Sequence, residues 1–173
     1  MRQKLGFALS IALVACIILA TRFYEVDIPV WRFFGGGAGI DPATLHLGGE
    51  FVESNLGTAR ESDGSFTVRM LAQQYVFVPQ CVVVPSGVPV HFRVTSADQV
   101  HLLKISETDF SLKAVPGAVS EVTTEFAKTG KFEAPCGEFC GAGHFAMRAR
   151  LEVVSADRFA GMQAGQRRSC DSR

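Results

Sequence analysis

Beyond its first third, the chain alternates between apolar and polar residues over short stretches. In the segment VPVHFRVTS, residues 88–96, Val88, Val90, Phe92 and Val94 fall on one side and His91 on the other. A period of two is typical of a β-strand with one buried face, because successive side chains of a strand point to opposite sides. We therefore expect a strand here, with His91 on its solvated face.

Other short segments also have sequences typical of β-strands and are separated by turn residues. They are FTVRMLAQQYVFV, CVVV, VHLLKI, AVSEVTTEFA, GKFEAPC and MRARLEVVS, at residues 66–78, 81–84, 100–105, 118–127, 130–136 and 147–155. Strands with turns about every ten residues, and no alternation with helices, are typical of a Greek-key sandwich or barrel. The pattern predicts a mainly β domain at residues 65–155.

The N-terminal segment has a different pattern. After the basic start MRQK, Leu5 to Ala20 is sixteen residues without a charge. Such a run favours a membrane anchor at residues 1–24, with the rest of the chain on the outer side of the cell membrane as a single-pass protein. A cleaved signal peptide and a lipid anchor at Cys16, within LVAC, are the alternatives. All three place the domain outside.

Two further segments show no sustained period. Residues 25–64, which include FFGGGAGIDPATLHLGGEF, are rich in glycine and are expected to form an irregular connector that packs against a partner subunit. His46 in this segment is interpreted as a surface residue. The tail at residues 156–173 is expected to begin as a short helix.

Composition and charge exclude one class of function. The 17 basic and 17 acidic residues give a formal net charge of zero, without the clustered basic excess that nucleic-acid binding needs. The five cysteines are unevenly spread and do not resemble a disulfide framework. Cys136 and Cys140 form the one close pair.

That pair belongs to the stretch APCGEFCGAGHFAM, residues 134–147. Cys136, Cys140, His144 and Met147 lie within twelve residues, and they carry the soft and borderline ligands of metal chemistry. Gly141 and Gly143 are expected to let the backbone turn tightly back toward the metal. The pattern therefore indicates a metal site on one loop.

A further strong ligand has to come from elsewhere, and His101, just after the strand at 88–96, is the candidate. The residues leave four possibilities. They are a Cys136–Cys140 disulfide, a Cys2His2 zinc site in which Met147 only packs, a mononuclear blue copper site with one cysteine to spare, and two coppers that share both sulfurs.

The stretch from HLLKI to GHFAM resembles the binuclear copper (CuA) domain of cytochrome c oxidase subunit II. The resemblance rests on the C-x-E-x-C-x-x-x-H-x-x-M pattern and covers about residues 66–155. It implies a cupredoxin-like fold in which Cys136 and Cys140 bridge two coppers. It also implies that His101 and His144 bind one copper each. Met147 and the carbonyl of Glu138 are then the weak ligands.

The resemblance implies three further roles. The Glu138 carboxylate is expected to help hold a magnesium ion at the contact with subunit I, and Asp98 to face the same subunit. The tryptophan-rich strand of many relatives is replaced by AQQYVFVP, which leaves Tyr75, with Phe77 beside it, where electrons enter. The alternative interpretations are an exposed loop residue for Glu138 and a strand-end turn residue for Asp98. For Tyr75 and Phe77 the alternative is ordinary packing within the sandwich.

The function implied is that of the subunit through which electrons enter a haem–copper terminal oxidase. The donor would be cytochrome c or a small copper protein, and the acceptor haem in subunit I, where oxygen is reduced. Phe139, Phe145 and Val100 are expected to exclude water from the metals. The alternatives are the matching subunit of a nitric oxide reductase, a copper-delivery protein and a zinc-stabilised binding module. Nitrous oxide reductase has little weight because its chain is far longer.

Overall fold

The computed structural model describes residues 39–162 together with Ile11 and Cys170, and this part of the chain is mainly β as expected. The strands are β1 (Gly57–Arg60), β2 (Phe66–Gln73), β3 (Val76–Val78), β4 (Cys81–Pro85), β5 (Pro89–Ser96), β6 (His101–Lys104), β7 (Ser111–Ala114), β8 (Ser120–Glu125), β9 (Gly130–Pro135) and β10 (Arg148–Val154). Three 3₁₀ helices, η2 (Pro42–Thr44), η3 (Glu53–Asn55) and η4 (His144–Ala146), and the α-helix α2 (Ala156–Ala160) complete the described elements.

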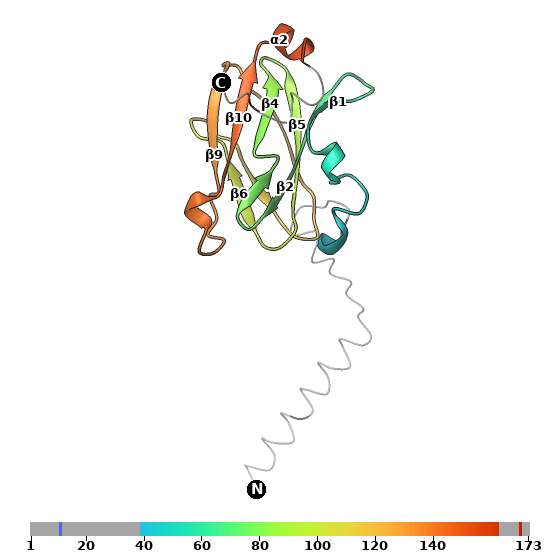
Figure 1. Cartoon of the computed structure of the whole chain (residues 1–173), viewed down its shortest axis with the longest axis vertical. Coiled ribbons are helices and arrows are strands. Elements are labelled where there is room, and N and C mark those ends of the chain that lie inside the picture. Colours follow the sequence, from blue (N-terminus) through green and yellow to red (C-terminus); the bar gives the residue numbers. More distant parts are fainter. Residues whose placement is uncertain (1–10, 12–38, 163–169, 171–173) are drawn as a thin grey trace. The chain divides into compact units, whose positions relative to one another are not determined.

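The strands form two main sheets and a hairpin (Figure 1). One sheet has the order β1-β2-β5-β8, with β3 also pairing with β2, and the other has the order β4-β10-β9. β2 pairs with β5, and β4 with β10, in parallel, while the remaining ladders are antiparallel. β6 and β7 form the hairpin.

The core lies between the sheets and follows the alternation in the sequence. Val90, Phe92 and Val94 of β5 are fully buried, whereas His91 points outward and bonds through Nδ1 to Thr123 Oγ1 at 2.9 Å. β10 contributes buried residues from the facing sheet, Ala149, Leu151 and Val153 among them. The expected strand with a solvated His91 is therefore confirmed.

The single long strand expected at residues 66–78 is wrong. β2 ends at Gln73, the chain turns at Gln74 and Tyr75, and β3 returns antiparallel to β2. Both halves have β-type sequences, and a two-residue turn leaves no glycine or proline signal. The break carries Gln74 and Tyr75 out of the ladder and onto one end of the sandwich.

The segment before β2 is more ordered than the sequence indicates. Leu45, Phe51 and Leu56 pack with Val119 in a small apolar cluster of their own. The carboxylate of Glu50 accepts hydrogen bonds from arginines on β2 and β5. Residues that the sequence assigned to an irregular connector therefore cover the domain itself and contribute strand β1.

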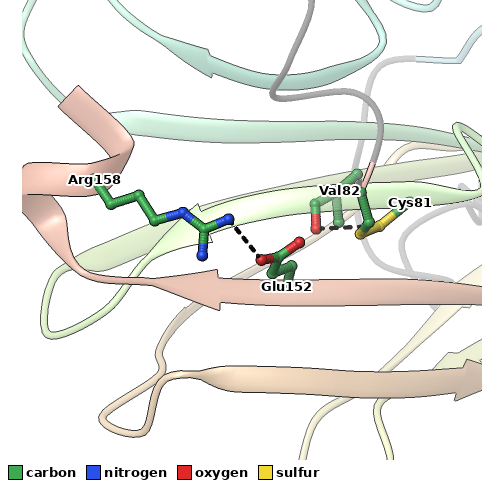
Figure 2. The surroundings of a disulfide bond; sticks show 5 residues. Cys81, Val82, Glu152 and Arg158 are labelled. Atoms are coloured by element: carbon green, nitrogen blue, oxygen red, sulfur yellow. Dashed lines mark hydrogen bonds and ion pairs between the residues drawn. A yellow bond between two sulfur atoms is a disulfide. The ribbon is translucent and has the colours of Figure 1, made fainter. Parts of the chain in front are cut away.

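The C-terminal part of the domain is fastened in two ways. Ser155 caps α2 by accepting from Arg158 N at 3.4 Å, and Phe159 packs edge-on against Phe66 with ring centroids 5.2 Å apart. The short helix expected after residue 155 is thus confirmed. Figure 2 shows the second attachment, a disulfide that joins Cys81 at the start of β4 to Cys170, 89 residues later.

The anchor expected at residues 1–24 lies outside the described residues, apart from Ile11. No helix within the described part of the chain combines the length and the apolar character needed to cross a membrane.

Candidate metal centre

The loop between β9 and β10, which carries most of the predicted ligands, lies at the end of the sandwich opposite α2 (Figure 1). Residues 136–147, here called the ligand loop, connect β9 to β10. Cys136 directly follows β9, and Met147 directly precedes β10. Because β9 and β10 are antiparallel neighbours, the loop begins and ends at one point, where Cys136 N donates to Met147 O at 3.0 Å.

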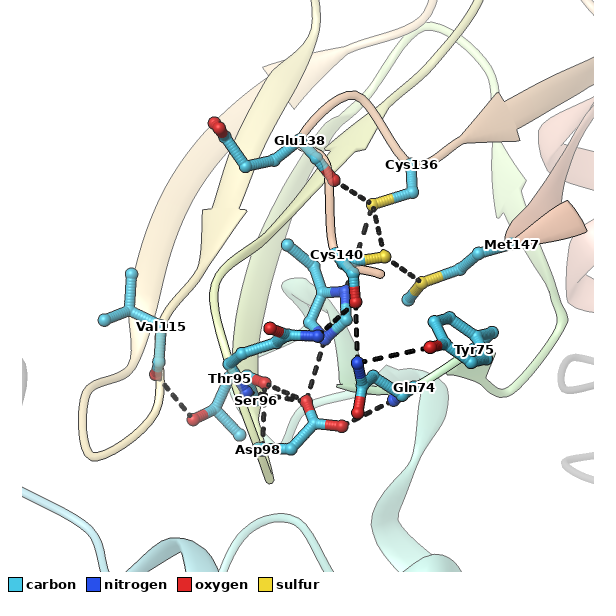
Figure 3. Close-up of polar contacts among 12 residues, drawn as sticks. Gln74, Tyr75, Thr95, Ser96, Asp98, Val115, Cys136, Glu138, Cys140 and Met147 are labelled. Carbon is cyan, nitrogen blue, oxygen red and sulfur yellow. Dashed lines mark hydrogen bonds and ion pairs between the residues drawn. The ribbon is translucent and has the colours of Figure 1, made fainter. Parts of the chain in front are cut away.

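Cys136 lies among three candidate ligands. Its Sγ is 3.9 Å from Cys140 Sγ, 3.9 Å from His101 Nδ1 and 3.2 Å from the carbonyl oxygen of Glu138 (Figure 3). His101 is the first residue of β6 and is completely buried. The ligand atoms of His101, Cys136 and Cys140 all lie within 4.8 Å of one another.

Cys140 has a matching set on its other side. Its Sγ is 3.6 Å from His144 Nδ1 and 3.7 Å from Met147 Sδ. Each cysteine sulfur therefore has one imidazole nitrogen and one weak donor of its own, and the two sulfurs face each other.

The two thiols are free and buried, and are not joined in a disulfide. Burial, and then the adjacent Cys136, raises the pKa of the Cys140 thiol to about 11. A cation bound between the sulfurs would replace their protons. Metal–sulfur bonds are about 2.3 Å long, so sulfurs 3.9 Å apart are close enough to share metal ions. The donor set therefore fits a soft or borderline metal.

Asp98 orients one of the histidines. Its Oδ1 lies 2.8 Å from His101 Nε2, which leaves Nδ1 directed at Cys136. Partial burial acts to raise the pKa of Asp98, but hydrogen bonds from His101 and from the backbone N–H groups of Gln74 and Gln99 outweigh it and hold that pKa below its ordinary value. A carboxylate behind a ligating histidine fixes its ring orientation and tautomer.

The aromatic residues that we expected near the metals differ in exposure. Tyr75 is 39% exposed and covers Gly141 and Gly143 of the ligand loop. Phe77 is fully buried, with its ring edge-on to His101 at a centroid distance of 6.4 Å. Tyr75 therefore lies at the surface, and Phe77 lies in the core behind His101.

Of the three residues expected to exclude water, two pack against a metal ligand: the rings of Phe139 and Phe145 lie 5.6 and 5.2 Å from the ring of His144. Phe139, Phe145 and Val100 are among the most exposed large apolar residues of the described chain, at 73%, 84% and 37%. On the core side, Phe77 packs edge-on against His101 and Leu103 pairs with Cys136. Phe139 and Phe145 therefore present exposed apolar surface on the ligand loop itself.

Sequence reasoning missed two residues at this site. The side chains of Gln74 and Gln99 both donate to the carbonyl oxygen of Cys140. Neither residue type is a metal ligand here, and they lie 66 and 41 residues away from Cys140, so no local pattern could have identified them.

Comparison with known proteins agrees with this geometry. The sequence model of the family described as cytochrome c oxidase subunit II, periplasmic domain, matches residues 64–154, which is more than half of the chain. The chain belongs to this family. Subunit II is part of an oxidoreductase complex, and the matched residues include every predicted metal ligand.

Individual relatives carry the same description. The chain is 29% identical to cytochrome c oxidase subunit 2 of Thermus thermophilus over 114 residues, which cover 66% of this chain and 84% of that protein. It is 37% identical over 78 residues to a probable cytochrome c oxidase subunit 2 of Rickettsia bellii, which cover 45% of this chain and 29% of that protein.

Solved structures show the same fold. The periplasmic domain of cytochrome oxidase subunit II of Bradyrhizobium japonicum superposes with a TM-score of 0.50 at 24% identity, over 54% of this chain and 87% of that one. A chain from a haem–copper terminal oxidase dimer superposes with a TM-score of 0.52 at 24% identity. The match covers 89% of this chain and 100% of that one. The cupredoxin-like β architecture expected from the sequence is therefore confirmed.

Proposed function

We propose that this chain is the subunit through which electrons enter a haem–copper terminal oxidase. Cytochrome c or a small copper protein is the donor, and haem in subunit I is the acceptor, where oxygen is reduced. The observation that carries the proposal is the pairing of donors around the two sulfurs. Each sulfur faces one histidine Nδ1 and one weak donor.

This pairing favours two coppers over the other metal sites. A zinc site would use two sulfurs and two nitrogens and would not need the Met147 sulfur 3.7 Å from Cys140. A mononuclear blue copper site would leave one cysteine without a role. In our proposal Cys136 and Cys140 are shared, His101 and His144 are divided between the metals, and Met147 and the Glu138 carbonyl complete the set.

When bound, a copper pair supplies one-electron redox chemistry with the electron shared between the metals. The chain's own part is to keep the ligands still. The ligand loop is closed at its base by Cys136 N and Met147 O, and Gly137 N donates to Leu102 O on β6 at 2.8 Å. Ligands held by strand ends move little between redox states, which keeps electron transfer fast.

The exposed residues around the loop suit the docking of a donor. Tyr75 lies between solvent and the loop, and Phe139 and Phe145 are exposed on the same loop, packed against His144. Exposed aromatic side chains are the usual anchors of transient interfaces. We propose that the donor binds this surface and that electrons enter beside Tyr75, with Phe77 packing behind His101.

The main chain and the side chain of Glu138 point in different directions. Its carbonyl oxygen faces Cys136, whereas its exposed carboxylate points away from the sulfurs (Figure 3). We propose that this carboxylate contributes to a magnesium site at the contact with subunit I. Asp98, whose side chain is 31% exposed, holds His101 and presents its outer edge to the same subunit.

We further propose that residues 1–24 form a single membrane anchor in the cell membrane and that the domain lies on its outer side. The disulfide between Cys81 and Cys170 suits such an oxidising compartment.

Metal content and spectra of the purified full chain test the function. We expect two coppers per chain and a seven-line hyperfine pattern in the electron paramagnetic resonance spectrum, lost in a Cys136→Ser variant. The complex should consume oxygen when supplied with reduced donor. One labile copper, bound zinc, or turnover of nitric oxide without oxygen would contradict the proposal.

A further inference from the structure

The carbonyl oxygen of Cys140 accepts two side-chain hydrogen bonds. Gln74 Nε2 donates to it at 2.6 Å, and Gln99 Nε2 donates to the same oxygen. Gln74 lies in the turn between β2 and β3, whereas Gln99 lies between β5 and β6. Two separate loops therefore hold one atom of the ligand loop (Figure 3).

Gln74 also reaches the other half of the site. Its backbone N–H donates to Asp98 Oδ2 at 2.6 Å, and Asp98 Oδ1 lies 2.8 Å from His101 Nε2. One residue is thus bonded to Cys140 through its side chain and, by way of Asp98, to His101 through its main chain. Gln74 therefore connects the histidine on β6 to the ligand loop.

The ligand loop needs such support away from its base. Its backbone bonds lie at its base, where Cys136 pairs with Met147 and Gly137 N donates to Leu102 O of β6, and in the 3₁₀ turn around His144. Cys140 lies between these two regions. A carbonyl oxygen has two lone pairs, and here both are used by donors from outside the loop.

We propose that Gln74 and Gln99 form an amide clamp that fixes the position of Cys140, and with it the sulfur shared between the metals. They act as positioning residues: they touch no ligand atom, but hold the residue that carries one. The proposal rests on the copper centre proposed above and adds what retains the metal there.

The clamp also has an electrostatic consequence. The two amide N–H dipoles direct their positive ends at the Cys140 carbonyl and offset its negative end beside the sulfurs. Without them, the unopposed carbonyl dipole would favour the more positive, oxidised state of the centre. Removal of the clamp is therefore expected to lower the reduction potential as well as to loosen the metal.

The test uses the full chain with Gln74→Leu, Gln99→Leu and the double substitution. Leucine keeps the approximate volume and removes the donor. Gln73→Leu is the matched control, because Gln73 is an exposed glutamine whose side chain makes no hydrogen bond to another described residue. The measurements are copper release to a Cu(I) chelator, the copper hyperfine pattern, and the reduction potential.

We expect the double variant to release copper about 10- to 100-fold faster, the range typical for loss of outer-shell partners. The single variants should fall between it and the wild type, the potential should shift downward, and Gln73→Leu should match the wild type. A double variant with the release rate and potential of the wild type would overturn the clamp.

A second measurement separates the clamp from the copper proposal. In the metal-free chain, alkylation of Cys140 and Cys136 is followed by mass spectrometry. Loss of the clamp should increase the rate at Cys140 more than at Cys136, whatever metal the site binds. Equal rates in variant and wild type would sink the clamp, whereas wild-type protein without two coppers would refute only the copper centre. Circular dichroism verifies folding, and the single variants carry the test if the double variant unfolds.

Discussion

The ring of Tyr75 covers Gly143 so closely that no side chain fits there. A methyl group on Gly143 would lie 2.5 Å from Tyr75 Cγ, well inside van der Waals contact. The backbone of Gly143 is ordinary, with φ of −89°, so the glycine is required by this contact and not by its own conformation. Gly141 is restricted twice, because it has φ of +121° and a methyl there would lie 2.6 Å from Tyr75 Oη.

Gly143→Ala should therefore displace Tyr75 and destabilise the metal-free chain by about 1–3 kcal/mol, the usual cost of overpacking. Urea unfolding of the full chain measures this. The double variant Gly143→Ala/Tyr75→Ala removes the clash and should recover part of the loss. A double variant as unstable as the sum of its parts would show that the two residues are not coupled.

Asp98→Ala should weaken copper binding by about 10- to 100-fold, since His101 would lose the acceptor that orients its ring. Chelator competition gives the affinity, and the hyperfine pattern reports the altered histidine. Asp109→Ala is the control, because Asp109 is exposed in the turn between β6 and β7, away from His101. The role assigned to Asp98 fails if both variants bind copper alike.

Phe145→Ser should lower the kcat/KM for oxidation of the reduced donor by about 5- to 30-fold, as expected for one aromatic anchor of an interface. Phe145 is 84% exposed, so the stability of the fold should not change. Its ring packs against His144, so copper content is measured in the same samples and the rate is compared per bound copper pair. Leu47→Ser is a matched control, because Leu47 is 73% exposed and lies outside the ligand loop. Equal effects of the two substitutions would argue against a docking surface around the loop.

Cys170→Ser should lower the free energy of unfolding by about 2–4 kcal/mol, because the disulfide to Cys81 closes a long loop and restricts the unfolded chain. Urea unfolding of the metal-free full chain measures the change, and the copper spectrum should stay as in the wild type. Cys81→Ser should match Cys170→Ser, and a reductant should destabilise the wild type but neither variant. If the reductant leaves the free energy of unfolding of the wild type unchanged, the disulfide does not contribute to stability.

Glu50→Gln tests the polar cluster on the sheet of β2 and β5. Partial burial acts to raise the pKa of Glu50, but Arg93 and Arg69 outweigh it and hold that pKa below its ordinary value of 4.5. A carboxylate whose pKa is lower in the folded than in the unfolded chain stabilises the fold at pH values above the unfolded-state pKa. This stabilisation is lost as the pH falls through the folded-state pKa. We expect the free energy of unfolding of the variant to be about 1 kcal/mol lower than that of the wild type at pH 7. At acidic pH, where Glu50 is protonated, the two should be equally stable. A difference independent of pH would indicate packing instead of charge.

The sequence predicted best what depends on near neighbours. The ligand loop was identifiable because four of its ligands lie within twelve residues, and the strands because burial follows a period of two. What it could not predict depends on contacts between distant segments. The amides of Gln74 and Gln99 reach Cys140 only because three loops meet at one end of the sandwich, and Cys81 meets Cys170 only once β4 is in place. Exposure was misjudged for Phe139 and Phe145, since an apolar residue on a loop carries no signal of the side it faces.

The bond between Cys81 and Cys170 also sets an order of events during biosynthesis. Cys81 is made 89 residues before its partner, and Cys136 and Cys140 are both made in the interval. The Cys81 thiol therefore meets two unsuitable downstream partners before the right one exists. Correct maturation requires that the middle pair be kept apart from Cys81, by folding, by metal or by a reducing helper, until the last thiol arrives.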